Sequence, residues 1–301
     1  MLQKQFARGK KTGRRFGKGA ELCERKNKMR KIVITVAPVA GKHLEGTVNP
    51  LSPETIARDV IACAKAGASQ VHLHVRDVEG NLTEDISVFS DTMLQIRKQS
   101  DIILQGSTGG VSDLTLEARC TAVKEPRVEV VSLNLGSCNF GEGVYVNTLP
   151  DIRYWAGKIS AAGVKPELEI FDAGMMNNVA LLAEEGVLKA PFAYGFVLGV
   201  RGALPATAHS LHFLQGLVPP GSIWGCIHAE MEDLSLLATA IGMGASFVRV
   251  GFEDSIYYSP GKIAGNNAEL VDQVADLIHS MGLEAANPEE ARRILEVFPK
   301  R

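Results

Sequence analysis

The chain has 301 residues, of which 46% are hydrophobic and 22% are charged, and its formal net charge is -2 at pH 7. This composition is typical of a globular protein with a substantial core, and the small net charge predicts neither a nucleic-acid partner nor an acidic membrane surface. No segment is apolar over the roughly 20 residues that a membrane helix needs. The five cysteines show no CxxC spacing, which favours a reducing cytoplasmic location over a disulfide framework.

The first 28 residues differ from the rest of the chain. They are rich in lysine, arginine and glycine and lack the apolar stretch of a secretory signal. We interpret residues 1–28 as a flexible basic N-terminal extension before an internal start at Met29. A transit peptide or a nucleic-acid-binding arm is the alternative for this segment. Residues 29–301 are predicted to form a single catalytic domain.

From Lys31 onward, short β-branched runs alternate with longer amphipathic segments. Helix N-caps are expected at Ser52 and Ser112, and helices are expected to end at Gly67, Gly163 and Gly282. In chain order, the expected elements are strand 31–37, helix 53–66, strand 69–75, helix 86–99, strand 101–105, helix 113–124, strand 128–133, helix 150–162, strand 166–171, helix 175–186, strand 192–198, helix 207–217, strand 222–227, helix 231–243, strand 246–250 and helix 267–281.

This alternation predicts an α/β protein of the (β/α)8 TIM-barrel class, because strand and helix follow one another through a length of about 250 residues. The alternative is an open doubly wound sheet. Such a sheet usually carries a glycine-rich phosphate turn after its first strand, and here segment 38–41 reads PVAG. We therefore predict the barrel.

Polar residues stand where the predicted strands end, which is where TIM barrels place their catalytic groups. Segment 72–77 reads HLHVRD, and side chains two positions apart on a strand point to the same face. His72 and His74 therefore converge, and two neutral imidazoles are good zinc ligands. The structural alternative is a hydrogen-bonded buried pair.

Segment 248–254, VRVGFED, offers the carboxylate that such a metal needs. Glu253 lies an even number of positions after Arg249, and side chains at such positions of a strand point to the same face. We therefore expect both to face the barrel while Asp254 begins the loop. The last strand neighbours the first in a closed barrel, which brings Glu253 towards the histidines. An N-cap pair or a solvated loop is the alternative for Glu253 and Asp254. Glu169 is a rival carboxylate, better suited to substrate contact or a buried ion pair.

Two further strand ends are polar. Segment 105–110, QGSTGG, offers the hydroxyls of Ser107 and Thr108 to a ligand, unless it is simply a tight turn. Asn134 lies in segment 132–141, SLNLGSCNFG, which opens a long loop ending near 149, and loops of this length are usually functional. Other polar side chains are expected to be passive or packed residues, namely Cys138, His209, His212 and His228.

These motifs resemble the β-keto acid cleavage enzymes, whose best-known member is the 3-keto-5-aminohexanoate cleavage enzyme. The resemblance is carried by ITVAP at 34–38, HLHVRD at 72–77, STGG at 107–110, SLNLGSCNFG at 132–141, ELEIFDAG at 167–174, VRVGFED at 248–254 and NNAELV at 266–271. Segments 38–43 and 224–232 depart from the family's usual pattern. These departures bear on which substrate class the chain would use more than on the type of reaction.

The resemblance implies a zinc-dependent acyltransferase on a TIM barrel. A β-keto acid and acetyl-CoA would give acetoacetate and a new acyl-CoA by Claisen and retro-Claisen steps, in a homotetramer. It implies zinc ligation by His72, His74 and Glu253, a general base at Asp254 with Arg249 as its cationic partner, and substrate contacts at Ser107 or Thr108, Asn134 and Glu169. Two other functions are weighed against it: a metal-dependent hydrolase that uses a zinc-bound water, and a non-catalytic barrel that binds a small carboxylate.

Overall fold

The computed structural model describes residues 29–41 and 44–297, and the predicted N-terminal extension over residues 1–28 lies outside this part of the chain. Eight parallel strands pair in the order in which they follow one another, and the last pairs with the first, which closes the sheet into a barrel. The predicted TIM barrel is confirmed. Its strands are β1 (Lys31–Val36), β2 (Gln70–Leu73), β3 (Ile103–Ser107), β4 (Val130–Asn134), β7 (Lys165–Ile170), β8 (Ala193–Leu198), β9 (Ile223–His228) and β10 (Phe247–Val250).

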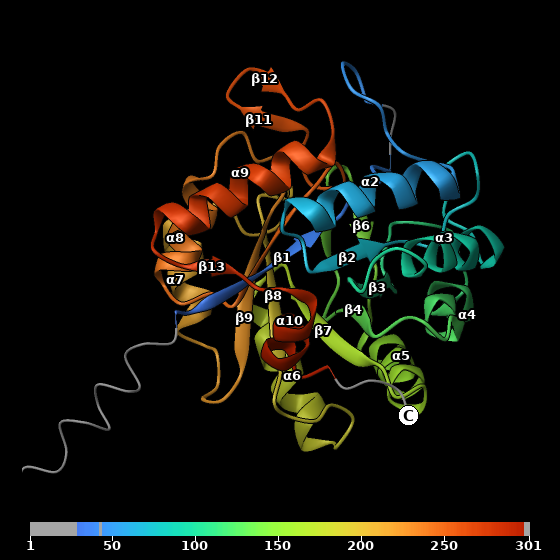
Figure 1. The fold of residues 1–301 in the computed structure, drawn as a ribbon. Coiled ribbons are helices and arrows are strands. Elements are labelled where there is room, and N and C mark those ends of the chain that lie inside the picture. Colours follow the sequence, from blue (N-terminus) through green and yellow to red (C-terminus); the bar gives the residue numbers. More distant parts are fainter. Residues whose placement is uncertain (1–28, 42–43, 298–301) are drawn as a thin grey trace, which may run out of the picture. The chain divides into compact units, whose positions relative to one another are not determined.

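Helices cover the outside of the barrel, and α2 packs beside α9 (Figure 1). They follow the predicted ranges closely, with three exceptions. α8 begins later than expected, the predicted helix 113–124 is a short α-helix followed by a 3-10 turn, η2, and α10 was not predicted. The helices are α2 (Pro53–Ala66), α3 (Ser87–Arg97), α4 (Leu116–Arg119), η2 (Thr121–Lys124), α5 (Leu149–Ala161), α6 (Ala173–Glu184), α7 (Ala208–Gln215), α8 (Ser235–Gly242), α9 (Asn267–Ser280) and α10 (Pro288–Leu295).

The predicted N-cap at Ser52 is confirmed, whereas the one at Ser112 is wrong. Ser52 Oγ accepts a hydrogen bond from the backbone N–H of Thr55 at 3.3 Å. In the second case Thr115 caps α4, since its Oγ1 accepts from the backbone N–H of Ala118 at 3.2 Å. Ser112 instead accepts from the backbone two residues further along and closes a local turn before the helix.

Several short elements were not predicted. Two hairpins follow barrel strands: β5 (Cys138–Phe140) pairs with β6 (Gly143–Tyr145), and β11 (Tyr257–Ser259) pairs with β12 (Lys262–Ile263). β13 (Glu284–Ala285) pairs with the start of β1 and leads into α10. Strands of two or three residues are too short for an alternating pattern to identify. The first hairpin shows that the long loop expected after β4 is partly ordered by backbone pairing.

The barrel interior is apolar at one end and polar at the other. At the N-terminal ends of the strands, Val33, Ile103, Val130 and Phe247 belong to a buried cluster that includes residues of α10. A Cβ at Gly225 would lie 2.3 Å from the Phe247 ring, so any larger residue at position 225 would clash with this ring. The buried polar side chains of the strands, apart from Gln70 at the start of β2, lie in the middle of the strands or towards their C-terminal ends: Thr35, His72, Gln105, Ser107, Ser132, Asn134, Glu167, Glu169 and Arg249. The fold thus presents polar groups at the end where TIM barrels carry active sites.

Candidate metal centre and active site

Three side chains of metal-ligand type converge at the C-terminal end of the barrel. His72 lies on β2, His74 directly follows that strand, and Glu253 lies in a turn after β10. Oε1 of Glu253 is 3.4 Å from Nε2 of His72 and 3.5 Å from Nε2 of His74. Within the described part of the chain, one ligand atom from each of the three lies within 4.8 Å of the others. The structure therefore brings together the three residues that the sequence predicted as metal ligands.

The spacing and chemistry of these donors fit a divalent metal ion. Atoms bound to zinc at about 2.0–2.1 Å in a tetrahedral site lie about 3.3–3.4 Å apart, which matches the separations of 3.4 and 3.5 Å between the imidazole nitrogens and the carboxylate oxygen. Two histidines and one carboxylate are also a known donor set of catalytic zinc sites, which keep one position for water or substrate. The site is compatible with such an ion.

Glu253 reaches the site through a turn rather than by alternation along a strand. β10 ends at Val250, and the backbone N–H of Asp254 donates to the carbonyl of Gly251 at 2.9 Å. Gly251 has a φ of 137°, and a Cβ there would lie 2.2 Å from the carbonyl oxygen of Ala37. The expected direction of Glu253 is correct, but the parity reasoning behind it is wrong because the strand has already ended.

Burial and charge act in opposite directions on these groups. Burial favours the neutral acid of Glu253, but the two adjacent imidazoles outweigh it and hold the pKa of Glu253 well below its usual range. Burial lowers the pKa of His74. At His72 burial acts in the same direction, but the Glu253 carboxylate outweighs it and raises the pKa. The carboxylate is thus held in the ionised form that binds metal ions.

A buried arginine joins the carboxylates around this centre. From β10, Arg249 donates to Asp254 through Nε at 2.8 Å and through Nη2 at 2.6 Å. Its guanidinium also lies 3.3 Å from Glu169 and 3.4 Å from Glu253. This bidentate contact between the guanidinium and the carboxylate fixes the orientation of the Asp254 side chain. The sequence predicted Arg249 as a partner of Asp254, and the structure places them in direct contact.

Asn134 and Glu169 lie opposite each other on β4 and β7. Oδ1 of Asn134 accepts from the backbone N–H of Gly136 at 2.9 Å, whereas its buried Nδ2 has no partner among the described residues. An unpaired buried amide is costly, so this N–H group is suited to a ligand oxygen. Burial raises the pKa of Glu169, and the nearby Arg249 only partly offsets this effect.

The structure distinguishes the two hydroxyls after β3. Thr108 Oγ1 donates to the carbonyl of Ser132 at 2.7 Å, so its proton is already engaged. Ser107 Oγ accepts from the backbone N–H of Gly109 at 3.0 Å and lies 3.3 Å from Ser132 Oγ. The geometry therefore favours Ser107 over Thr108 as a hydroxyl that contacts substrate.

None of the side chains expected to be passive belongs to the cluster of three metal-ligand residues, although His228 is close enough to Asp254 for that carboxylate to act on its pKa. Cys138 is half-buried on β5, where burial raises the pKa of its thiol to about 11 and makes it a poor nucleophile. His209 and His212 are exposed on α7. His228, at the end of β9, is half-buried, and burial lowers its pKa.

Two residues near the centre carry no motif of their own. Gln105 hydrogen-bonds His72 within the barrel. Tyr145, on β6, is buried, and its hydroxyl accepts from the backbone N–H of Gly110 at 3.0 Å; burial raises the pKa of this phenol to about 12. Both contacts join segments far apart in the sequence, so no local pattern indicated them.

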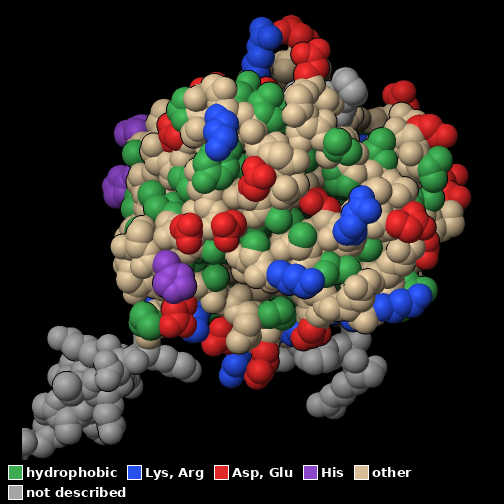
Figure 2. Space-filling view, turned by 45° about the horizontal axis from the view of Figure 1, so that its top comes forward, with side chains coloured by type: hydrophobic (Ala, Val, Ile, Leu, Met, Phe, Trp, Pro, Cys, Tyr) green, Lys and Arg blue, Asp and Glu red, His purple; other side chains and the backbone are tan. Residues whose placement is uncertain are grey.

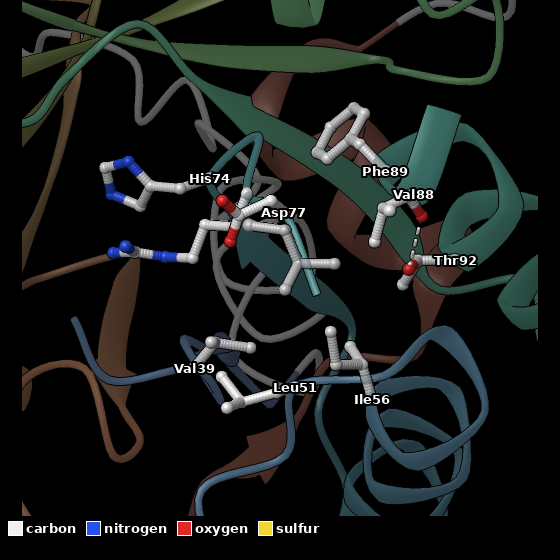
Figure 3. Close-up of a pocket in the computed structure, with 10 residues that line it drawn as sticks. Val39, Leu51, Ile56, His74, Asp77, Val88, Phe89 and Thr92 are labelled. Atoms are coloured by element: carbon white, nitrogen blue, oxygen red, sulfur yellow. Dashed lines mark hydrogen bonds between the residues drawn. The ribbon is translucent and has the colours of Figure 1, made fainter. Parts of the chain in front are cut away.

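A small cavity of about 20 Å³ lies beside β2. Its walls are mostly apolar side chains of β2, α2, α3 and the segments before α2, and the imidazole of His74 points away from them (Figure 3). Because a volume of about 10–15 Å³ on this measure holds one water molecule, the cavity is too small for a substrate. It is a gap between the strands and helices, and His74 belongs both to its wall and to the metal centre.

The surface shows no concentration of one charge on the face drawn in Figure 2, where acidic and basic side chains are interspersed. In the described ranges, no helix is both long and apolar enough to cross a membrane.

Comparison with known proteins extends over nearly the whole described chain. The sequence model of the beta-keto acid cleavage enzyme family matches residues 31–297. This chain belongs to that family. It is 38% identical over 274 residues to the 3-keto-5-aminohexanoate cleavage enzyme of Fusobacterium nucleatum, covering 89% of this chain and 99% of the relative. The protein is accordingly an enzyme, and the resemblance seen in its motifs is confirmed.

Other members differ in their named substrates. The chain is 30% identical over 299 residues to the 3,5-dioxohexanoate:acetyl-CoA acetone transferase of Paraburkholderia graminis, covering 89% of this chain and 96% of the relative. It is 32% identical over 272 residues to the 3-oxoadipate:acetyl-CoA acetyltransferase of Cupriavidus necator, covering 87% of this chain and 94% of the relative. Among solved structures, ObcA in a ternary complex with a C4-CoA adduct and oxalate superposes with a TM-score of 0.70 at 20% identity, over 83% of this chain and 67% of ObcA. That likeness supports the fold alone.

Proposed function

We propose that this protein is a zinc-dependent acyltransferase that converts a β-keto acid and acetyl-CoA into acetoacetate and a new acyl-CoA. One observation carries the proposal: in a member of the beta-keto acid cleavage enzyme family, His72, His74 and Glu253 converge beside the Arg249–Asp254 pair. The acetyl-CoA co-substrate is inferred from the names of the relatives that use it. Family membership favours this reaction over the metal-dependent hydrolase and the non-catalytic carboxylate binder.

His72, His74 and Glu253 would hold the ion. Zinc bound there would act as a Lewis acid towards the carboxylate and ketone oxygens of the β-keto acid, which makes its C2 proton more acidic. The three ligands together carry one negative charge, so the loaded centre keeps a net positive charge that favours an anionic substrate.

Asp254 is the proposed general base. Arg249 engages both of its oxygens at 2.8 and 2.6 Å, which aims the carboxylate, while each oxygen keeps a further lone pair for the C2 proton. When Asp254 becomes neutral, the charge of Arg249 remains compensated by Glu169 and Glu253 at 3.3 and 3.4 Å. The proton transfer therefore leaves no unpaired buried charge.

The remaining steps exchange two acyl groups. The C2 carbanion attacks the acetyl carbon of acetyl-CoA, and the C–S bond breaks to release CoA thiolate. The thiolate attacks the original ketone carbon, the bond between that carbon and C2 breaks, and Asp254 returns its proton to C2. The products are acetoacetate and the acyl-CoA of the original acyl group. Ser107 and Asn134 are the proposed donors to substrate oxygens, which is supported by the buried Nδ2 of Asn134 that has no partner among the described residues.

The test is an assay for acetoacetate with acetyl-CoA and four β-keto acids named for relatives: 3-keto-5-aminohexanoate, 3,5-dioxohexanoate, 3-dehydrocarnitine and 3-oxoadipate. These acids differ in charge beyond the reacting carbons, so their relative rates report the preferred substrate class. With isotopically labelled acetyl-CoA, the label should appear in acetoacetate. Turnover of the β-keto acid without acetyl-CoA would instead identify a hydrolase. We further propose a cytoplasmic homotetramer, whose mass is measured by light scattering.

A further inference from the structure

One metal-ligand histidine has a dedicated hydrogen-bond partner inside the barrel. Gln105 on β3 lies directly opposite His72 on β2 in the parallel pairing of the two strands. Its Oε1 is 2.9 Å from Nδ1 of His72, and both side chains are buried, with 0% and 1% of their surface exposed. The strand register thus makes this contact, which no sequence motif marks.

We propose that Gln105 is a positioning residue that keeps the ring proton of His72 on Nδ1 and presents Nε2 to the metal. The inference rests on the proposed metal site. A neutral imidazole carries its proton on one nitrogen and a lone pair on the other. An amide oxygen at Nδ1 only accepts, so it selects the tautomer whose free lone pair lies on Nε2, the atom 3.4 Å from Glu253. Partners of this kind orient metal-binding histidines and raise their basicity.

The reversed amide would have the opposite effect. Nε2 of Gln105 would then donate to Nδ1 and force the ring proton onto Nε2 of His72, where it blocks metal binding. That proton would have to be donated to Glu253 across 3.4 Å, which is longer than a normal N–H···O bond of about 2.7–3.2 Å. In the observed orientation Nε2 of Gln105 has no partner in the described part of the chain. The hydrogen bond of this side chain is therefore the one between its Oε1 and the imidazole of His72.

The two histidines are therefore not equivalent. Their rings stand nearly perpendicular, with centroids 5.2 Å apart and an interplanar angle of 80°. His74 contacts Glu253 through Nε2, but among the residues that the structure describes no side chain hydrogen-bonds its Nδ1. Pre-orientation by Gln105 makes His72 the anchoring ligand of the pair.

The test compares three variants by zinc affinity, measured by competition with a chromogenic chelator. Gln105→Met removes the acceptor and should weaken zinc binding about 10–100-fold, the usual effect of losing such a partner. Gln105→Glu restores an oxygen acceptor at Nδ1 and should bind zinc within a few-fold of wild type. The matched control is Gln70→Met, which removes a buried glutamine on β2, the strand of His72. Gln70 donates to Glu167 at 3.1 Å, and its loss should leave zinc affinity unchanged.

A spectroscopic readout separates positioning from general stability. Long-range ¹H–¹⁵N spectra of the zinc-free protein, recorded at a pH at which the His72 imidazole is neutral, should show its single ring proton on Nδ1 in wild type and Gln105→Glu, and a mixture of tautomers in Gln105→Met. Equal zinc affinity of Gln105→Met and Gln70→Met would overturn the inference, as would wild-type His72 protonated on Nε2. If Gln105→Met does not fold, the wild-type tautomer decides. A wild-type protein that binds no zinc would refute the proposed metal site, a result distinct from either of these.

Discussion

Replacing Asp254 with asparagine should separate proton transfer from metal binding. The side chains are nearly isosteric, and one amide oxygen still accepts from Arg249. The amide nitrogen, however, would face a guanidinium N–H where the carboxylate now accepts at 2.6 or 2.8 Å. Two donors then meet, and one charged hydrogen bond worth about 1.5–3 kcal/mol is lost.

The loss of stability should stay below the roughly 3–5 kcal/mol that an unpaired buried charge costs, because Glu169 and Glu253 remain within 3.4 Å of Arg249. The effect on catalysis should be larger. Positioned general bases contribute about 10²–10⁴-fold, which corresponds to roughly 3–5.5 kcal/mol of activation free energy. The variant should therefore fold and retain its metal while losing turnover.

The direct assay is deuterium uptake at C2 of the β-keto acid in D₂O without acetyl-CoA, followed by mass spectrometry after spontaneous exchange is subtracted. Wild type should accelerate this exchange and Asp254→Asn should not. Asp233→Asn is the matched control, because that carboxylate is exposed and accepts hydrogen bonds from Ser235 at the start of α8. Glu253→Gln should instead weaken metal binding, since a neutral amide is a poorer ligand than a carboxylate.

Two outcomes would refute this reasoning. If Asp254→Asn keeps full exchange and turnover, another group is the base, and Glu169 is the next candidate because burial raises its pKa. Asp172, which follows β7 in the chain, instead caps α6 by accepting from the backbone N–H of Gly174. If Asp254→Asn loses the metal while Glu253→Gln keeps it, the roles of the two carboxylates must be exchanged.

Three further predictions follow from the same structure. The His72→Ala, His74→Ala double variant should contain no stoichiometric zinc by elemental analysis, and chelation should abolish wild-type activity; a full equivalent of metal in the double variant would refute the site. Deletion of residues 1–28 should leave the melting temperature and turnover nearly unchanged, because that segment is basic and poor in core-forming residues, and a loss of several degrees would contradict this. Gly251→Ala should lower the free energy of unfolding by at least about 1–3 kcal/mol, measured by urea denaturation, because a Cβ would lie 2.2 Å from the carbonyl oxygen of Ala37; wild-type stability would show that the turn adapts.

The barrel was accessible from sequence because its signals are local. The β-branched runs and amphipathic segments recur in order. Both ends of helix 53–66 were predicted correctly, because Ser52 caps its N-terminus and Gly67 caps its C-terminus. The prediction failed where the local signal was ambiguous. Between 113 and 124, Ser112 and Thr115 both offer an N-cap, and the cap that forms lies at Thr115, next to the short α4.

The chemical types of the site residues were also accessible, whereas their relations were not. HLHVRD and VRVGFED indicated a metal-binding pair and a carboxylate at the ends of two strands that flank β1, and the structure brings them together. The reasoning for Glu253 was nevertheless wrong, because it assumed that the strand continues beyond Val250. The turn at Gly251 directs the side chain instead.

The sequence by itself determined the alternation of strands and helices, the helix ends with unambiguous caps, and the identities of the residues that gather at the strand ends. Only the tertiary structure decided which of them touch. Gln105 meets His72 across 33 positions, and Arg249 meets Glu169 across 80. Such contacts depend on strand register and on closure of β10 against β1. Register and closure are properties of the whole sheet, so periodicity and capping within one segment do not encode them.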